Sequence, residues 1–117
     1  MPDRAVTPIL SVDVEQHGDD LAIVRCRGRL VAGVTDVLYS RVNDLMPETQ
    51  QIILDLSGLQ HTDSMGLGAL VRLYVSAKSA GCTLELLNLS QQIRHLLGVT
   101  NMLAVFPVLG EEGIEFG

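Results

Sequence analysis

The apolar residues of this chain come in short runs, and the spacing within each run indicates a strand or a helix. Strand-like runs cover residues 9–14 and 21–30, and the sequence HGDD between them (residues 17–20) is typical of a turn. The chain is therefore expected to begin with a β-hairpin.

The middle of the chain alternates between helical and strand patterns. After Gly33, apolar residues recur at helical spacing until Pro47, which is expected to stop that helix. The run QIILDL over residues 51–56 is nearly continuous in apolar character, as expected of a central strand covered on both faces. A short polar loop then leads to a helix over residues 64–80, which Gly81 ends.

Two further strands and a short helix are predicted after residue 81. The run CTLELLNL over residues 82–89 is a strand pattern. Ser90 can cap a short helix through Leu97, which Gly98 is expected to end. The run AVFPVL over residues 104–109 contains a proline, which places this last strand at an edge.

This order of elements predicts an α/β fold. An initial hairpin is followed by a βαβαβα order, which gives a mixed sheet of about four to five strands with helices packed on it. The sequence has no internal repeat, linker or low-complexity tract, so we expect one domain over residues 1–117.

Composition and charge exclude several classes of function. Apolar residues make up 47% of the chain, but no run reaches the roughly 18 residues of a membrane-spanning helix. The net charge is −6 and the cations are scattered, so direct nucleic-acid binding is not expected. The N-terminus lacks an apolar signal core, and Cys26 and Cys82 are expected to be buried thiols in a reducing cytoplasm.

The helix over residues 64–80 has an unusual outward face. Its sheet-facing side is expected to hold Leu67, Ala69, Leu70, Leu73, Tyr74, Ala77 and Ala80. On the opposite side, Met65, Gly68, Val71 and Val75 would leave a low apolar patch beside the Ser64 hydroxyl. Exposed apolar patches rimmed by polar groups mark partner surfaces.

A serine at this position can act as a switch. Phosphorylation would add a charge of about −1.5 to −2, which a helix N-terminus tolerates, so the fold would survive. A partner packing on the patch would meet that charge, and Asp63 next to Ser64 would sharpen the repulsion. The hypothesis is that modification of Ser64 breaks a complex without unfolding the domain.

Helix capping is the simpler interpretation of the same residues. Thr62, Asp63 and Ser64 are all good capping residues, and on capping chemistry alone that interpretation ranks first. Gly66 and Gly68 favour the surface interpretation, because glycine in a helix costs about 0.5–1 kcal/mol and indicates a close approach by something else.

Enzyme chemistry finds little support in the sequence. A nucleophile elbow would need a glycine where Thr62 stands, and His17, His61 and His95 fit solvated positions better than a Ser–His hydrolase. The run GLGALV lacks the third glycine of a dinucleotide fingerprint and is not a P-loop. No cluster of residues has metal-ligand spacing. No cofactor is therefore expected, and the chain is not expected to be an enzyme.

The run IILDLSGLQHTDSMGLGALV resembles the signature of STAS domains, particularly the bacterial anti-sigma factor antagonists. The matching positions are DLS at residues 55–57 and DSMGLG at residues 63–68. The similarity continues over GRL (residues 28–30), GCTLELLNLS (81–90) and IRHLLGVTNM (93–102).

The resemblance implies a cytoplasmic switch protein that binds an anti-sigma factor, which is often also a serine kinase. The kinase would supply the ATP and phosphorylate Ser64, and a serine phosphatase would reset the cycle. The partner surface would comprise Thr62, Asp63, Met65, Gly66, Gly68 and Val71, with the Gly33 loop at its edge. Direct nucleic-acid binding and membrane insertion are not implied.

Two features depart from the pattern of that family. Val31 and Ala32 stand in a loop where many members carry an acidic residue and then a Thr or Ser. The C-terminal sequence EEGIEFG is short for the last helix of many members. The alternative is therefore a STAS subunit that docks constitutively in a lipid-transport ABC complex or a signalling scaffold, with Ser64 unmodified.

Overall fold

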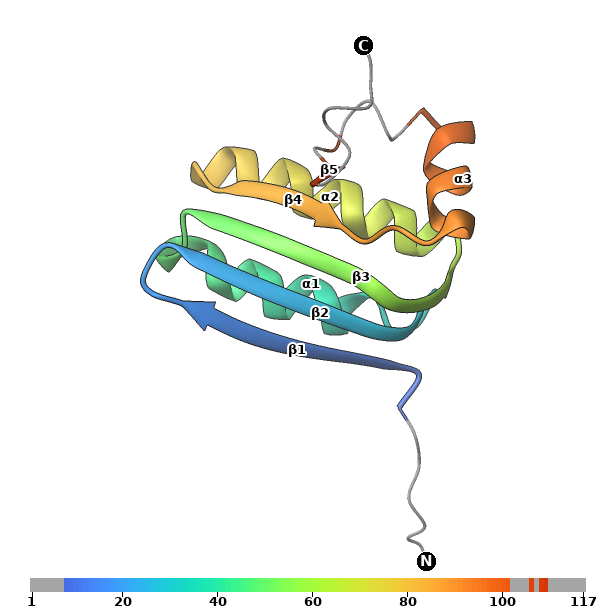
Figure 1. Cartoon of the computed structure of the whole chain (residues 1–117), viewed down its shortest axis with the longest axis horizontal. Helices are drawn as coiled ribbons and strands as arrows, with labels where there is room; N and C mark the ends of the chain where they lie inside the picture. The colour runs from blue at the N-terminus through green and yellow to red at the C-terminus, as the bar shows by residue number, and fades with distance from the viewer. Residues whose placement is uncertain (1–7, 102–105, 107, 110–117) are drawn as a thin grey trace, which may run out of the picture.

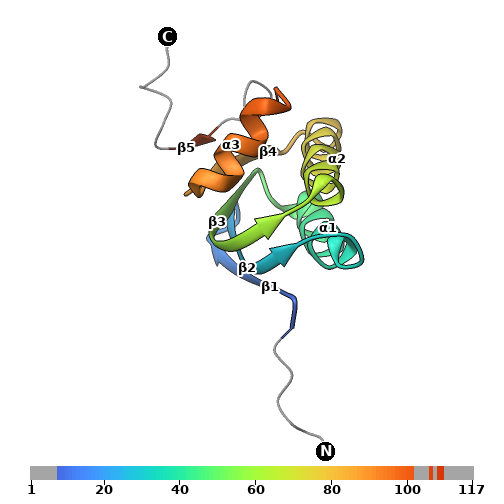
Figure 2. The ribbon, with the colours of Figure 1, turned by 90° about the vertical axis from the view of Figure 1, so that its right-hand side faces the viewer.

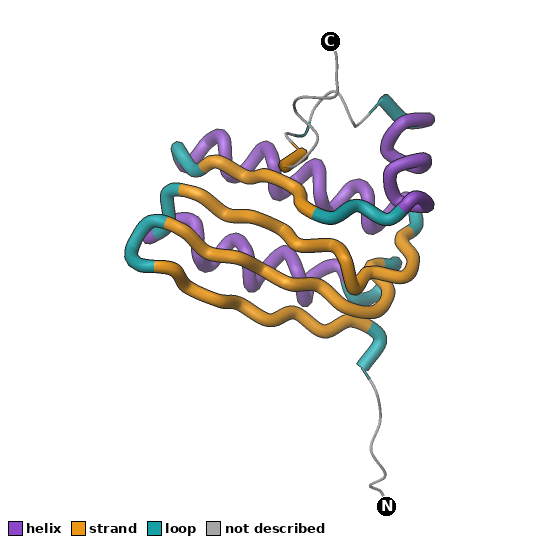
Figure 3. Tube along the Cα trace, in the orientation of Figure 1, coloured by secondary structure: helices purple, strands orange, loops and turns teal. Residues whose placement is uncertain are grey.

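The computed structural model describes residues 8–101, 106, 108 and 109, and these form a five-stranded sheet with helices packed on it (Figures 1 and 3). The elements in chain order are β1 (Leu10–His17), β2 (Leu21–Leu30), α1 (Thr35–Leu45), the 3-10 turn η1 (Met46–Glu48), β3 (Gln51–Thr62), α2 (Ser64–Ala80), β4 (Thr83–Leu87), α3 (Gln91–Val99) and β5 (Val108–Leu109).

The sheet has the mixed topology that the sequence predicts. Its strand order is β1-β2-β3-β4-β5, with β1 antiparallel to β2 and every later pair parallel. The initial hairpin is confirmed, and β5 lies at an edge as expected. Residues 104, 105 and 107 of the predicted last strand lie outside the described residues.

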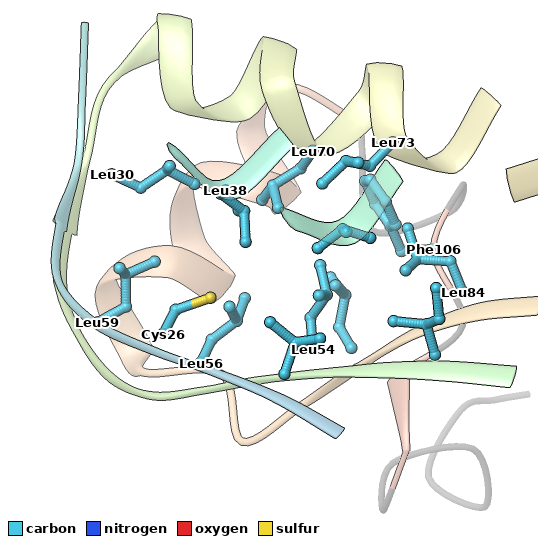
Figure 4. Close-up of a cluster of buried hydrophobic side chains, with 14 of the residues drawn as sticks. Cys26, Leu30, Leu38, Leu54, Leu56, Leu59, Leu70, Leu73, Leu84 and Phe106 are labelled. Carbon is cyan, nitrogen blue, oxygen red and sulfur yellow. The ribbon is translucent and has the colours of Figure 1, made fainter. Parts of the chain in front are cut away.

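The core fills the space between the sheet and the helices α1 and α2, which cover the same face of the sheet (Figure 2). Leu54 of β3, Leu38 of α1 and Leu70 of α2 meet there and are fully buried (Figure 4). The helix α3 lies at the end of the sheet where β3 ends and α2 begins (Figure 1). No helix within the described ranges is long and apolar enough to cross a membrane.

Strand β3 is longer than the sequence indicates. Residues 57–62, expected to be a loop, continue the strand, because pairing with β2 runs on to Thr62 opposite Leu30. Two register shifts give β3 extra residues relative to β2, and these bulges hide the strand pattern. Gly58 is needed at the first bulge, since a Cβ there would lie 2.5 Å from the Cγ of Arg27.

The helix α2 begins and ends where the sequence predicts. Gly81 follows it with a left-handed φ of 75°, and the Gly81 amide bonds the last turn. The buried side matches the helical wheel except at Ala80, which is exposed, and at Tyr74, which is half-buried.

The helix α3 runs past its expected stop. Gly98 remains helical and Thr100 is the C-cap, with its hydroxyl donating to the Leu96 carbonyl at 2.9 Å. The predicted N-cap is confirmed, since the Ser90 side chain accepts a bond from the Ile93 amide.

Candidate functional site

Ser64 is the first residue of α2 and is exposed to solvent. It lies at the end of the sheet where the parallel strands β2 and β3 finish, where the β2–α1 loop and the β3–α2 junction come together (Figures 1 and 2). The carboxyl ends of parallel strands are the usual location of binding sites in α/β folds.

Asp63 is the N-cap of α2. Its Oδ1 accepts a hydrogen bond from the Gly66 amide at 2.9 Å, and its Oδ2 accepts one from the Ala32 amide at 3.0 Å. These two amides, Ala32 first, hold the pKa of the Asp63 carboxyl below its usual range. The carboxylate is therefore ionised at neutral pH and stands directly before the Ser64 hydroxyl.

Thr62 and Gly66 lie beneath this surface, not on it. The Thr62 side chain is 3% exposed and its hydroxyl donates to the Leu30 carbonyl at 2.7 Å. A Cβ on Gly66 would lie 2.1 Å from the Thr62 Oγ1 and 2.2 Å from the Leu30 oxygen. The close approach that the glycine allows is between α2 and the ends of β2 and β3. Both positions were expected at the partner surface, and the structure instead gives them an internal packing role.

The other members of the predicted surface are accessible. Met65 is 58% exposed and Val75 is 56% exposed, while Val71 is half-buried. No atom lies within 4 Å of a Cβ built on Gly68, so this glycine leaves open space above the helix. We call the surface formed by Ser64, Met65, Gly68, Val71 and Val75 the α2 patch.

The β2–α1 loop forms a tight turn beside the start of α2. The Val34 amide donates to the Val31 carbonyl at 3.1 Å, and Gly33 has a φ of +93°. This is the pattern of a type II turn, in which Ala32 and Gly33 are the central residues. Ala32 and Gly33 are both exposed, which agrees with the expectation that the Gly33 loop borders the site.

The contact between Asp63 and Ala32 could not be predicted from the sequence. The donor is the backbone amide of a residue 31 positions away in the sequence, and the pattern of side chains does not indicate such a bond. The N-capping role of Asp63, in contrast, was one of the stated alternatives and is confirmed.

Other polar and thiol groups of the described residues make contacts of their own. The Nδ1 atom of His61 lies 3.3 Å from the Nε2 of Gln92, so its ring faces α3. Within the described ranges no group of His, Cys, Asp and Glu could hold a metal ion. Cys26 and Cys82 are buried free thiols, and burial raises the pKa of Cys26 to about 12.

A family model settles the relationship that this geometry indicates. The model of the STAS domain matches residues 11–112. The chain belongs to the STAS domain family. STAS proteins with curated names include the anti-sigma F factor antagonist of Paenibacillus polymyxa, which is 26% identical over 88% of this chain and 89% of its own length. The anti-sigma-B factor antagonist of Bacillus subtilis (strain 168) is 26% identical over 85% of this chain and 90% of its own length.

Solved STAS structures share the fold at lower identity. The anti-sigma factor antagonist SpoIIAA in its unphosphorylated form aligns with a TM-score of 0.72 and 17% identity, over 89% of this chain and 92% of that one. The murine anion transporter Slc26a9 aligns with a TM-score of 0.64 and 23% identity, over 72% of this chain and 14% of that one. The same fold therefore occurs in a small regulator and within a much larger transporter.

Proposed function

We propose that this STAS domain is an anti-sigma factor antagonist whose binding to its partner is controlled by phosphorylation of Ser64. The observation that carries the proposal is the exposed Ser64 hydroxyl at the first position of α2, next to the apolar α2 patch. Two antagonists that match most of the chain, and over most of their own lengths, support the same role.

The position of Ser64 allows a phosphate without unfolding. A helix N-terminus has unpaired amides and a partial positive charge, which stabilise an anion. The cap itself is unaffected, because the Asp63 carboxylate and not the Ser64 hydroxyl bonds the Gly66 amide. Phosphorylation would therefore change the surface and leave the fold intact.

The same phosphate would oppose docking. It would stand beside the ionised Asp63 and at the border of exposed Met65, so a partner covering the patch would have to bury two neighbouring negative charges. The two cations of α2 are engaged elsewhere, with Arg72 over the Tyr39 ring at 4.3 Å and Lys78 over the Tyr74 ring at 5.7 Å. The expected result is release of the partner.

The partners follow from this role. An anti-sigma factor with serine kinase activity would bind ATP and modify Ser64, and a serine phosphatase would restore the hydroxyl. The chain itself acts by binding, in the cytoplasm where sigma factors work, and needs no cofactor of its own.

Intact-mass spectrometry tests the proposal directly. The wild-type protein is incubated with ATP and the anti-sigma kinase of its own organism, beside a Ser64→Ala control. One added phosphate on the wild type and none on the control is the expected result. No phosphate, with the kinase shown to be active on another substrate, would overturn the switch.

A charge-mimic pair tests the consequence for binding. Ser64→Asp is expected to fold normally and lose the anti-sigma factor. Ser79→Asp adds the same charge to an exposed position about 22 Å along the same helix, at 1.5 Å per residue, and is expected to bind like wild type. Equal binding by both variants would contradict the proposal.

The second candidate function is a constitutive docking subunit of a transport complex or signalling scaffold. The exposed, apolar Ala32 in the β2–α1 loop favours it, since the switch members of the family that this chain resembles carry polar residues there. Stable co-purification of the chain with a permease or scaffold, together with an unmodified Ser64, would support this function.

A further inference from the structure

The Asp63 carboxylate does more than cap its helix. A capping residue needs one oxygen to accept a bond from the first turn, and Oδ1 does this with the Gly66 amide. Oδ2 accepts from the Ala32 amide, which belongs to a different element of the fold. One carboxylate therefore joins the start of α2 to the β2–α1 loop.

The loop has few other restraints at its tip. The Thr62 hydroxyl and the Asp63 amide both bond the Leu30 carbonyl, at 2.7 Å and 3.4 Å, and so fix the point where the loop leaves β2. The turn is closed within itself by the bond from Val34 to Val31. Among the described residues, the hydrogen bond from the Ala32 amide to Asp63 is the one that joins the turn itself to the start of α2.

We propose that Asp63 is a positioning residue that holds the β2–α1 loop in place, so that a partner meets the loop and the α2 patch as one preformed surface. This inference rests on the proposed function. A surface that is ordered before binding pays less conformational entropy on association. Asp63 thus contributes to affinity through Ala32, without needing its own contact with the partner.

A direct attraction between Asp63 and a basic partner is the rival explanation. Both explanations expect Asp63→Asn to bind more weakly, so this variant alone does not separate them. Asparagine is as good an N-cap as aspartate, so the helix is retained, but its amide NH2 cannot accept the bond from Ala32 while its oxygen caps the helix.

Ala32→Pro separates the two explanations. Proline has no amide N–H, so the bond to Asp63 is lost while the Asp63 charge remains. Proline is also favoured at the first central position of a type II turn, which Ala32 occupies, so the turn itself is retained. Ala32→Ser keeps the N–H and is the matched control.

Affinity for the anti-sigma factor is measured by titration calorimetry, with the melting temperature recorded for each variant. Asp63→Asn and Ala32→Pro are each expected to weaken binding by about ten-fold or more, the size of one hydrogen bond to a charged group. Ala32→Ser is expected to bind like wild type. Normal binding by a folded Ala32→Pro, beside weak binding by Asp63→Asn, would overturn the inference in favour of direct charge attraction.

A measurement without the partner tests the bond itself. The NMR shift of the Ala32 amide proton is followed through a pH titration of the free protein. It is expected to change with the ionisation of Asp63, below the usual carboxyl range, and to stay flat in Asp63→Asn. A flat profile in wild type would overturn the inference. If wild type binds no anti-sigma factor, the proposed function fails, and this titration alone decides whether Asp63 holds the loop.

Discussion

Asp55 and Asp63 are two carboxylates of the same sequence signature, but one lies in a buried structural region and the other at the accessible surface. Asp55 is on the sheet face away from α1 and α2, where it is 8% exposed and bonded to the Ser57 amide at 3.0 Å and to Asn88 at 3.2 Å. Asp63 borders the accessible surface at the start of α2. In the first region the carboxylate is buried and bonded to neighbouring residues of the same chain. In the second region an exposed hydroxyl and an apolar patch lie beside the carboxylate.

The pKa does not distinguish these two regions. Burial raises the pKa of Asp55, but hydrogen bonds from Ser57 and Asn88 and the charge of Arg25 outweigh it, so the net shift is downward. The pKa of Asp63 is also lowered, by backbone amides. A perturbed carboxylate therefore points to function only when its neighbours include an accessible group that a partner or an enzyme can reach.

The sheet face around Asp55, which α1 and α2 do not cover, carries several ion pairs. Arg25 bonds Glu15 on β1 and lies 3.6 Å from Asp55 on β3, and Arg27 bonds Asp13 at 2.7 Å. Cross-strand pairs of this kind stabilise a sheet modestly when they are exposed. We interpret this face as a solvated, stabilising surface.

The largest effect is expected from Gly66→Ala, which tests how tightly α2 approaches β2 under Asp63. The added methyl would lie about 2 Å from the Leu30 carbonyl oxygen, which is backbone and cannot move aside cheaply. Overpacking of this kind costs typically 1–3 kcal/mol, and here we expect about 3 kcal/mol or more. Urea denaturation measures it, and a free energy of unfolding equal to wild type would show that the close approach is absent.

The next effect is expected from Asp55→Ala, which tests whether the sheet region serves stability alone. It leaves the Ser57 amide and the Asn88 side chain without this acceptor and removes one of the two ion pairs of Arg25, so we expect a loss of about 2 kcal/mol of unfolding free energy. Affinity for the anti-sigma factor should not change. Asp63→Asn should show the reverse profile, with weaker binding and a smaller loss of stability than Asp55→Ala.

Weakened binding by a folded Asp55→Ala would contradict the view that the region of Asp55 serves stability alone, because it would place that sheet face within the partner surface. The denaturation and calorimetry of the two variants are therefore measured side by side.

The sequence predicted the region of Asp63 better than the region of Asp55. Helix α2, its N-cap and its outward face follow from helical spacing and capping chemistry, which are local. The burial of Thr62 and Gly66 was missed because it arises from contacts with Leu30, which is distant in the chain. An accessible patch can be predicted from the sequence of one helix. A packed junction can be predicted only when both contacting segments are known.

The course of β3 could not be predicted for a related reason. Ser57 and Gly58 form a turn-like pair, and two bulges break the alternation that marks a strand. The predicted strand stops at residue 56, yet the pairing with β2 continues beyond it to Thr62. The alternation of Arg25 and Arg27 on β2 with Asp13 and Glu15 on β1 was the available signal for the ion pairs, once the hairpin register is known.

Acid sensitivity should appear in both regions. Each carboxyl has a folded pKa below its unfolded value of about 4, so its stabilising contribution is present above that value and is lost as the pH falls through the folded pKa. Unfolding free energy measured between pH 7 and pH 2 should therefore fall below about pH 4.

Variants assign that decline to the two carboxyl groups. Asp55→Asn and Asp63→Asn should each fall less steeply than wild type, because each lacks one of the titrating groups. A wild-type slope retained in Asp55→Asn would mean that the contacts of Asp55 do not depend on its charge.

The smallest effect, of opposite sign, is expected from Gly68→Ala. This glycine is two residues beyond Gly66 on the same helix, but a Cβ there meets no atom within 4 Å. Replacing a helical glycine should therefore stabilise the protein by about 0.5–1 kcal/mol in urea denaturation. The same methyl would stand on the α2 patch between Met65 and Val71, so a partner that packs closely there should bind less tightly. A variant that is more stable and binds as well as wild type would show that the partner does not use the space that Gly68 leaves open.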